Sequence, residues 1–403
     1  MKLIKNNFVR LSPVLILAVI LIFSLTLIPS VNPTPKNLPI ALVNEDQGVT
    51  LPDHSKMNMG NTVGEMIRSA AEKGSTNDPT VKWMAVTSSK EARKGMDDQK
   101  YYAALIIPKD FSQKQASLQT PKPISSEINI LVNQGMNTIA STTAGQMLNS
   151  IADNINDNVR TQLLSSFEKS DSKLTATQAA ALATPISKRV INVNETGTHS
   201  ANGNAPVSLF QPLWMASIAG AAILTLMLNK LTFTSRTEKF LNIVMQVLIG
   251  AVLAVFAGFG LTWMADLVGI HIPDFTAVSL FLAIAFFSFF LMISAVLSWL
   301  GLKAMPLFVL ILFFGAPLLA MAPEFMSSFY HDWVYPWLPM RFLVSGLREI
   351  FYFGNGLSWN EPTSTLAAIG IGSLIIFLAS AVKLNKIEEV AGQSENQIVH
   401  SKY

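Results

Sequence analysis

The side chains that most often perform chemistry are few and scattered in this sequence. The phosphate-binding pattern Gly-x-x-x-x-Gly-Lys-Ser/Thr, the zinc-binding pattern His-Glu-x-x-His and the Gly-x-Ser-x-Gly nucleophile turn are all absent. The chain has no cysteine, which excludes disulfides, thiolate zinc sites and thiol catalysis. We therefore expect no catalytic, cofactor-binding or metal-binding residues, and no ATPase activity in this chain. The five histidines have no metal-ligand spacing: His54, His199, His271, His331 and His400.

An acidic pair, Glu45 and Asp46, follows the first strand-like segment of the chain. Adjacent carboxylates could bind a cation weakly. Asn44 and Gly48 flank the pair, and this composition is typical of a turn that leaves a strand. We expect the pair to have this structural role and no catalytic one.

Hydrophobic residues make up 50% of the 403 residues and charged residues 14%, which is far below the roughly 25% charged residues of a soluble domain. The apolar residues gather in runs near the ~20 residues that cross ~30 Å of hydrocarbon. The first apolar run is 18 residues long and has no small-residue cleavage pattern, so we favour a membrane anchor over a signal peptide. The six predicted spans are residues 11–29, 207–228, 240–265, 276–300, 305–322 and 363–382.

Lysine and arginine orient these spans, because short cytoplasmic loops accumulate them. With the N-terminus inside, the cytoplasmic segments contain ten Lys and Arg, whereas the short outer segments contain two, Arg341 and Arg348. We therefore expect residues 1–10 and 383–403 in the cytoplasm and residues 30–206 outside the cell. The net charge of +3 gives no indication of nucleic-acid binding.

Short apolar blocks at 39–43, 81–86, 103–107 and 128–132 alternate with helical spacing, which predicts an extracellular α/β layer domain. Ser88 and Glu91 have the spacing of a capping box at the start of one helix. Apolar residues recur at intervals of about four over 137–167, beginning at Ile139, and indicate a long amphipathic helix. This helix packs either on the sheet of its own domain or on a second copy or partner. The polar segment 190–206 is interpreted as a linker back to the membrane.

The outer segment 325–357 is aromatic and interrupted by proline. Trp333 and Trp337 are expected to anchor it at the membrane interface, and Arg341 and Arg348 are spaced to share one side of a helix over 340–353. Two interpretations remain open: an interfacial helix whose arginines reach the headgroups, or a re-entrant gate on an export path. Because the spans contain almost no ionisable residues, a proton-coupled transporter is disfavoured and the energy for any transport must come from elsewhere.

Three pieces of sequence resemble a known family. They are Ala-Leu-Val-Asn-Glu-Asp-Gln-Gly at 41–48, Tyr-Tyr-Ala-Ala-Leu-Ile-Ile-Pro-Lys-Asp-Phe-Ser at 101–112 and Leu-Pro-Met-Arg-Phe-Leu-Val-Ser-Gly-Leu-Arg at 338–348. With the order of spans, they resemble the type-two permease subunits of ATP-binding-cassette exporters, above all the YhgE/Pip (phage infection protein) relatives. The longest of those relatives have far larger external regions.

The resemblance implies a permease half in a bacterial cell membrane that pairs with a second half, as a homodimer or heterodimer, and with a cytoplasmic ATP-binding subunit. It places the coupling surface at the basic N-terminus and at Arg236, Glu238 and Lys239. We expect a polytopic α-helical membrane protein, with six transmembrane helices and a large extracellular α/β domain between the first and second. Its expected function is export of a lipophilic or amphiphilic compound. The alternative is a non-transporting, membrane-anchored surface protein that acts as a receptor or secretion accessory.

Overall fold

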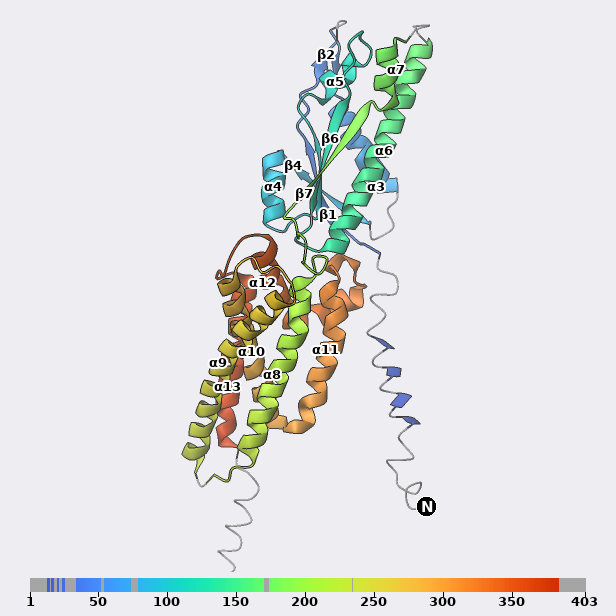
Figure 1. Ribbon diagram of the computed structural model, residues 1–403. Helices are drawn as coiled ribbons and strands as arrows, with labels where there is room; N and C mark the ends of the chain where they lie inside the picture. The colour runs from blue at the N-terminus through green and yellow to red at the C-terminus, as the bar shows by residue number, and fades with distance from the viewer. Residues whose placement is uncertain are drawn as a thin grey trace, which may run out of the picture. The chain divides into compact units, whose positions relative to one another are not determined.

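The computed structural model describes residues 34–51, 54–73, 79–169, 174–233 and 235–383, together with residues 13, 14, 16, 17, 20, 21, 24 and 25. The predicted segment 1–10 lies outside the described residues, as do most of the predicted span at 11–29 and all but the first residue of the predicted tail at 383–403. The described chain forms two compact units (Figure 1). The first contains the residues up to Asn204 and Pro317–Trp337, and the second contains Ala205–Ala316 and the residues from Leu338 onward.

The first unit is an α/β domain built on a sheet with the strand order β4-β1-β5-β6-β7. β1 pairs in parallel with β4 and β5, β5 pairs antiparallel with β6, and β6 pairs in parallel with β7. A small antiparallel pair, β2 (Val49–Thr50) and β3 (Lys56–Met57), lies apart from the sheet. The α/β prediction is therefore confirmed. The sheet strands are β1 (Leu38–Asn44), β4 (Val81–Val86), β5 (Ala103–Ile107), β6 (Ser126–Asn133) and β7 (Ile186–Val193).

The predicted linker at 190–206 is wrong at its start, because β7 continues to Val193. β7 is an edge strand whose central side chains are largely exposed. Its sequence mixes polar and apolar residues and lacks the continuous apolar run of a strand that is buried on both faces. This pattern explains why the sequence indicates a linker at the start of the segment.

Helices cover both faces of this sheet (Figure 1). Along β1, Leu38, Ile40 and Leu42 pack with α3, α5 and α6, while Ala41 and Val43 pack on the opposite face with α4. This division follows from the alternation of side chains along a strand. The four helices are α3 (Met59–Lys73), α4 (Ser89–Asp97), α5 (Phe111–Ser117) and α6 (Thr138–Lys169), and α7 (Ala176–Ala183) follows α6.

The long helix predicted at 137–167 is present as α6, and it packs on the sheet of its own domain. Its buried face is built largely from small residues, such as Ala140, Ala144 and Ala152, with Leu148 between them. Small side chains let the helix axis approach the strands closely. Ile139, which the apolar spacing placed on the packed face, is 54% exposed. The spacing of large apolar residues therefore did not reveal the buried face of α6, because small residues form most of that face.

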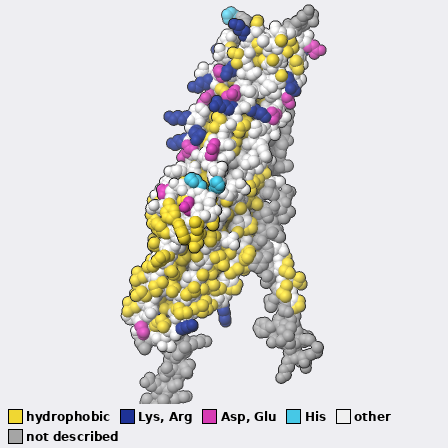
Figure 2. Space-filling model, in the orientation of Figure 1, with side chains coloured by type: hydrophobic (Ala, Val, Ile, Leu, Met, Phe, Trp, Pro, Cys, Tyr) yellow, Lys and Arg dark blue, Asp and Glu magenta, His cyan; other side chains and the backbone are white. Residues whose placement is uncertain are grey.

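The second unit, together with residues 317–320, contains the helices that indicate a multi-pass membrane protein. Hydrophobic side chains cover its visible face, whereas Lys, Arg, Asp and Glu gather on the α/β unit (Figure 2). Five helices among the described residues are long and apolar enough to cross a membrane. They are Ala205–Asn229 (α8), Arg236–Leu267 (α9), Phe275–Leu300 (α10), Leu302–Ala320, which contains α11 (Met305–Ala320), and Glu361–Val382, which contains α13 (Glu361–Ala379).

α10 is the most enclosed span, with 72% of its apolar window buried. α9 packs against it through a row of small residues, including Gly250, Ala254 and Gly258. A Cβ atom at Gly258 would lie closer than 3.0 Å to the carbonyl oxygen of Ser279 on α10. Lipid does not drive helices together as water does, so the two helices depend on this close backbone contact for their attraction.

Candidate functional site

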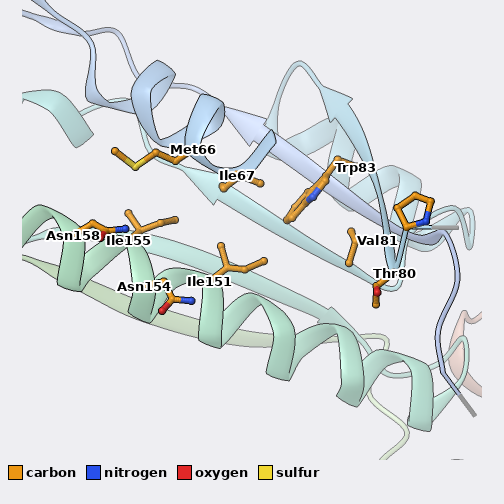
Figure 3. Close-up of a pocket in the computed structure, with 10 residues that line it drawn as sticks. Met66, Ile67, Thr80, Val81, Trp83, Ile151, Asn154, Ile155 and Asn158 are labelled. Atoms are coloured by element: carbon orange, nitrogen blue, oxygen red, sulfur yellow. The ribbon is translucent and has the colours of Figure 1, made fainter. Parts of the chain in front are cut away.

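An apolar cavity of about 350 Å³ opens on the face of the sheet that α3 and α6 cover. It is formed by α3, by the edge strand β4 with the two residues before it, and by α6 (Figure 3). The close-up shows α3 and α6 facing each other across the space, with Trp83 and Val81 at one end. The lining residues are Met66, Ile67, Pro79, Thr80, Val81, Trp83, Ile151, Asn154, Ile155 and Asn158.

The cavity is suited to a lipophilic group. Ile67 and Ile155 are each 3% exposed and belong to the domain core, and Trp83 and Ile151 are partly buried beside them. Two amides, Asn154 and Asn158, lie one helical turn apart on α6 and could bond a polar end of the ligand. No lining side chain carries a charge. A volume of this size with few polar groups is typical of a small-molecule site.

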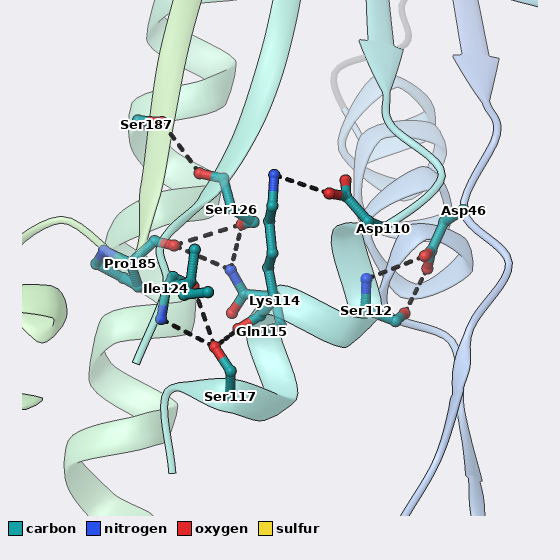
Figure 4. Close-up of polar contacts among 10 residues, drawn as sticks. All are labelled: Asp46, Asp110, Ser112, Lys114, Gln115, Ser117, Ile124, Ser126, Pro185 and Ser187. Carbon is teal, nitrogen blue, oxygen red and sulfur yellow. Dashed lines mark hydrogen bonds and ion pairs between the residues drawn. The ribbon is translucent and has the colours of Figure 1, made fainter. Parts of the chain in front are cut away.

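The acidic pair lies elsewhere, at the carboxyl end of β1. The Asp46 carboxylate accepts hydrogen bonds from the Gly60 amide at 2.9 Å, the Ser112 amide at 3.0 Å and the Gly48 amide at 3.3 Å. It also accepts one from the Ser112 hydroxyl (Figure 4). This single side chain therefore ties β1 to the first turns of α3 and α5.

Glu45 makes the corresponding contact with α4. Its Oε1 accepts from the backbone amide of Ser89 at 2.8 Å and from the Ser89 hydroxyl at 2.9 Å. The two neighbouring carboxylates thus turn to different helices and satisfy backbone N–H groups there. Among the described residues no three metal-ligating side chains cluster, and the pair has the structural role that its turn composition predicts.

The predicted capping box at Ser88 is present with one difference. The Ser88 hydroxyl accepts from the Glu91 amide at 3.2 Å, as the spacing predicts. The Glu91 carboxylate, however, accepts from the amide and hydroxyl of Thr87, one residue before the cap. The helix start is therefore fixed by two loop residues, Thr87 and Ser88, and by Glu91 in the first turn.

The four residues predicted at the outer gate or interface divide between the two units. Trp333 and Trp337 belong to the first unit, in short helical turns, and are 74% and 82% exposed. Arg341 and Arg348 lie in α12 (Met340–Tyr352) of the second unit, which packs against α8, α10 and α13. No residue of α12 is fully exposed. The predicted residues are therefore not brought together within one unit.

α12 holds its arginines among aromatic groups. The Arg341 guanidinium lies 4.4 Å from the ring centre of Phe342. Arg348 is half-buried and lies one turn before Tyr352, which is buried. Burial raises the pKa of the Tyr352 phenol to about 12, although the positive charge of Arg348 acts in the opposite direction.

The three residues predicted to couple to an ATPase occupy the first turn of α9. Ser235 caps this helix by accepting from the Glu238 amide at 3.1 Å. Arg236 is exposed, whereas Lys239 turns inward and its ammonium donates to the backbone carbonyl of Lys383. Arg236 is thus presented to a partner more openly than Lys239.

Residues 12–357 match the family described as "Protein of unknown function (DUF3533)". The chain belongs to the DUF3533 family. No curated protein and no solved structure matches the chain. The matched region of this DUF3533 protein includes the whole α/β unit, every residue of the apolar cavity and α12.

Sequence reasoning did not find the cavity of this DUF3533 protein, because three elements distant in the sequence build it. One local signal was present. Ile151, Asn154, Ile155 and Asn158 share one side of α6 by helical spacing, so two amides interrupt an otherwise apolar stripe. Trp83 in an edge strand was a second signal, since a large side chain there has no second neighbouring strand to pack against.

Proposed function

We propose that this chain is the permease subunit of an ATP-driven exporter in a bacterial cell membrane, and that it moves a lipophilic or amphiphilic compound outward. The observation that carries the proposal is the apolar cavity of the α/β unit. Its volume, its uncharged lining and its two amides fit a compound with an apolar body and one hydrogen-bonding end. Such a compound partitions into membranes, where the remaining helices lie.

The proposed energy source is supported by the distribution of charges in the spans. In the described spans, no Asp, Glu, Lys, Arg or His lies more than about one turn from a helix end. Proton-coupled carriers use ionisable groups at mid-depth as proton relays. ATP hydrolysis by a cytoplasmic partner is therefore the proposed source, and Arg236 and Glu238 at the start of α9 are the proposed contact with it.

The proposed topology has six spans, including residues 11–29, with both termini in the cytoplasm and residues 30–206 outside. A second permease half, as a homodimer or heterodimer, completes the transporter. The resemblance of segments 41–48, 101–112 and 338–348 to YhgE/Pip-type permeases supports this arrangement.

Ile151→Trp tests the cavity, because the larger side chain fills the space between α6 and α3. Ile139→Trp is the matched control, since it makes the same change at an exposed position of the same helix. Binding of an acyl-chain fluorophore is measured on the purified full chain by energy transfer from tryptophan. We expect the Ile151 variant to lose binding at least tenfold and the Ile139 variant to bind as the wild type does.

Efflux of the same fluorophore is then followed in cells that co-express candidate ATP-binding subunits. ATP-dependent efflux that disappears in the Ile151 variant and persists in the Ile139 variant supports an exporter. Binding without any ATP-dependent efflux, and without co-purification of an ATPase, contradicts it and favours the surface-protein alternative.

A further inference from the structure

The second unit contains a polar cavity of about 140 Å³ at the end of the bundle where α8 and α10 finish and α9 begins. The last residues of the C-terminal span also line it, so four helices contribute to its wall. The cavity is independent of the apolar one described above and lies in a different unit. The polar residues of its lining are Gln246, Lys239, Lys383, Thr225, Ser380, Asn229 and Ser298.

Gln246 is an unusual residue in this cavity. It lies on the buried face of α9, is 4% exposed, and neither its amide nitrogen nor its amide oxygen has a hydrogen-bond partner among the described residues. A buried amide without partners is costly, and native structures seldom retain one without a reason. Here the unpartnered amide lines a cavity large enough for a ligand group, which supplies a reason.

The charges around the cavity favour an anion. Two lysines, Lys239 and Lys383, line it, and none of its lining residues is acidic. The Lys383 ammonium donates to the carbonyl of Trp299 at 2.8 Å, which uses one of its three donors and holds the charge at the cavity wall. Hydroxyl groups of Thr225 and Ser380 add short polar contacts.

The surroundings favour an anion that carries apolar chains. Near this end of α9, the side chains of Leu241, Met245 and Leu248 are 60%, 55% and 55% exposed on the outer face of the helix. Acyl chains can lie on such a surface while a headgroup reaches between helix ends, as in known basic pockets for anionic headgroups.

We propose that this cavity binds a phosphate group, carried by an anionic phospholipid of the surrounding leaflet or present as free phosphate. The Lys239 and Lys383 ammonium groups compensate its charge, and the Gln246 amide donates to it. Bound phosphate would thereby hold the ends of α8, α9, α10 and the C-terminal span together. The site serves stability of the bundle and does not depend on the proposed transport function.

The test uses the full chain purified in detergent, with thermal unfolding followed as phosphatidylglycerol, phosphatidylcholine or inorganic phosphate is added. We expect phosphatidylglycerol to raise the unfolding temperature of the wild type in a saturable manner, and phosphatidylcholine to raise it far less. Lys239→Gln with Lys383→Gln should weaken this effect at least tenfold. Lys303→Gln, which removes an exposed lysine outside the cavity, should leave it unchanged.

Gln246→Leu separates ligand binding from folding. Replacing the unpartnered amide by an apolar group of similar size should raise the unfolding temperature of the lipid-free protein and weaken the response to phosphatidylglycerol severalfold. Stabilisation by inorganic phosphate without a phosphatidylglycerol preference would identify free phosphate as the ligand. Equal responses of the wild type, the double lysine variant and Gln246→Leu to all three additives would overturn the proposal.

Discussion

Asp46→Ala tests whether one carboxylate organises the α/β unit. The change removes the acceptor for the amides of Gly48, Gly60 and Ser112 and for the Ser112 hydroxyl. Each lost bond to a charged acceptor costs roughly 1.5–3 kcal/mol when the donor is buried. Ser112 and Gly60 are buried, whereas Gly48 and Asp46 are half-buried, so water replaces part of the loss. We therefore expect the unit to lose about 2–4 kcal/mol of stability.

Hydrogen exchange of the full chain in detergent measures this loss of stability segment by segment. A loss of 2–4 kcal/mol should accelerate amide exchange about 30- to 700-fold in peptides from β1, α3 and α5. Peptides from α13, in the other unit, serve as the internal reference. Asp46→Asn keeps one acceptor oxygen, so its exchange should fall between the wild type and the alanine variant.

Asp110→Ala is the matched control. Asp110 precedes α5, makes no side-chain capping bond, and pairs with Lys114 at 2.8 Å across an exposed surface. Exposed pairs of this kind contribute about 0.5 kcal/mol or less, so exchange should change by about twofold. If Asp46→Ala and Asp110→Ala accelerate exchange equally, the carboxylate of Asp46 does not join the three elements as argued.

Two further changes probe the contact between α9 and α10 and a buried hydrogen bond of β6. Gly258→Leu should lower the free energy of unfolding of the detergent-solubilised protein by about 1–3 kcal/mol, because the new side chain must displace the Ser279 backbone. Gly260→Leu, on the same helix with open space around it, should have little effect, and equal losses would refute the close α9–α10 contact. Asn133→Ala should lower the local stability of β6 by about 2–4 kcal/mol, as measured by hydrogen exchange, because the buried Asn133 amide donates to the Met96 carbonyl at 2.8 Å. Unchanged exchange there would show that water replaces the amide.

The strands that the sequence predicts well are those whose residues stand out from their neighbours in composition. β5 consists of five buried residues and β4 has the predicted bounds of 81–86, because both form short apolar blocks between polar segments. The five described spans were predictable for a similar reason, since hydrocarbon requires long apolar runs. These features depend on local composition alone.

The contacts of the sites could not be predicted in this way. Asp46 meets Ser112 across 66 residues of sequence, and Gln246 gains its significance from helix ends that the sequence places far apart. The burial of Ala140, Ala144 and Ala152 was also hidden, because alanine reads as neither strongly apolar nor polar. Tertiary packing decides all three cases.

The carboxylates of Glu45 and Asp46 restrict the ligands that can bind at the carboxyl end of β1. Sheets with parallel strands commonly receive phosphate-bearing ligands at the carboxyl ends of their strands, where helix N-termini supply N–H donors. In this domain Glu45 and Asp46 already occupy donors on α3, α4 and α5. A phosphate arriving about 4 Å from either carboxylate would meet repulsion of roughly 1–4 kcal/mol per charge pair. We therefore expect the strand ends to disfavour nucleotides by charge, which leaves the uncharged cavity between α3 and α6 for the proposed lipophilic ligand.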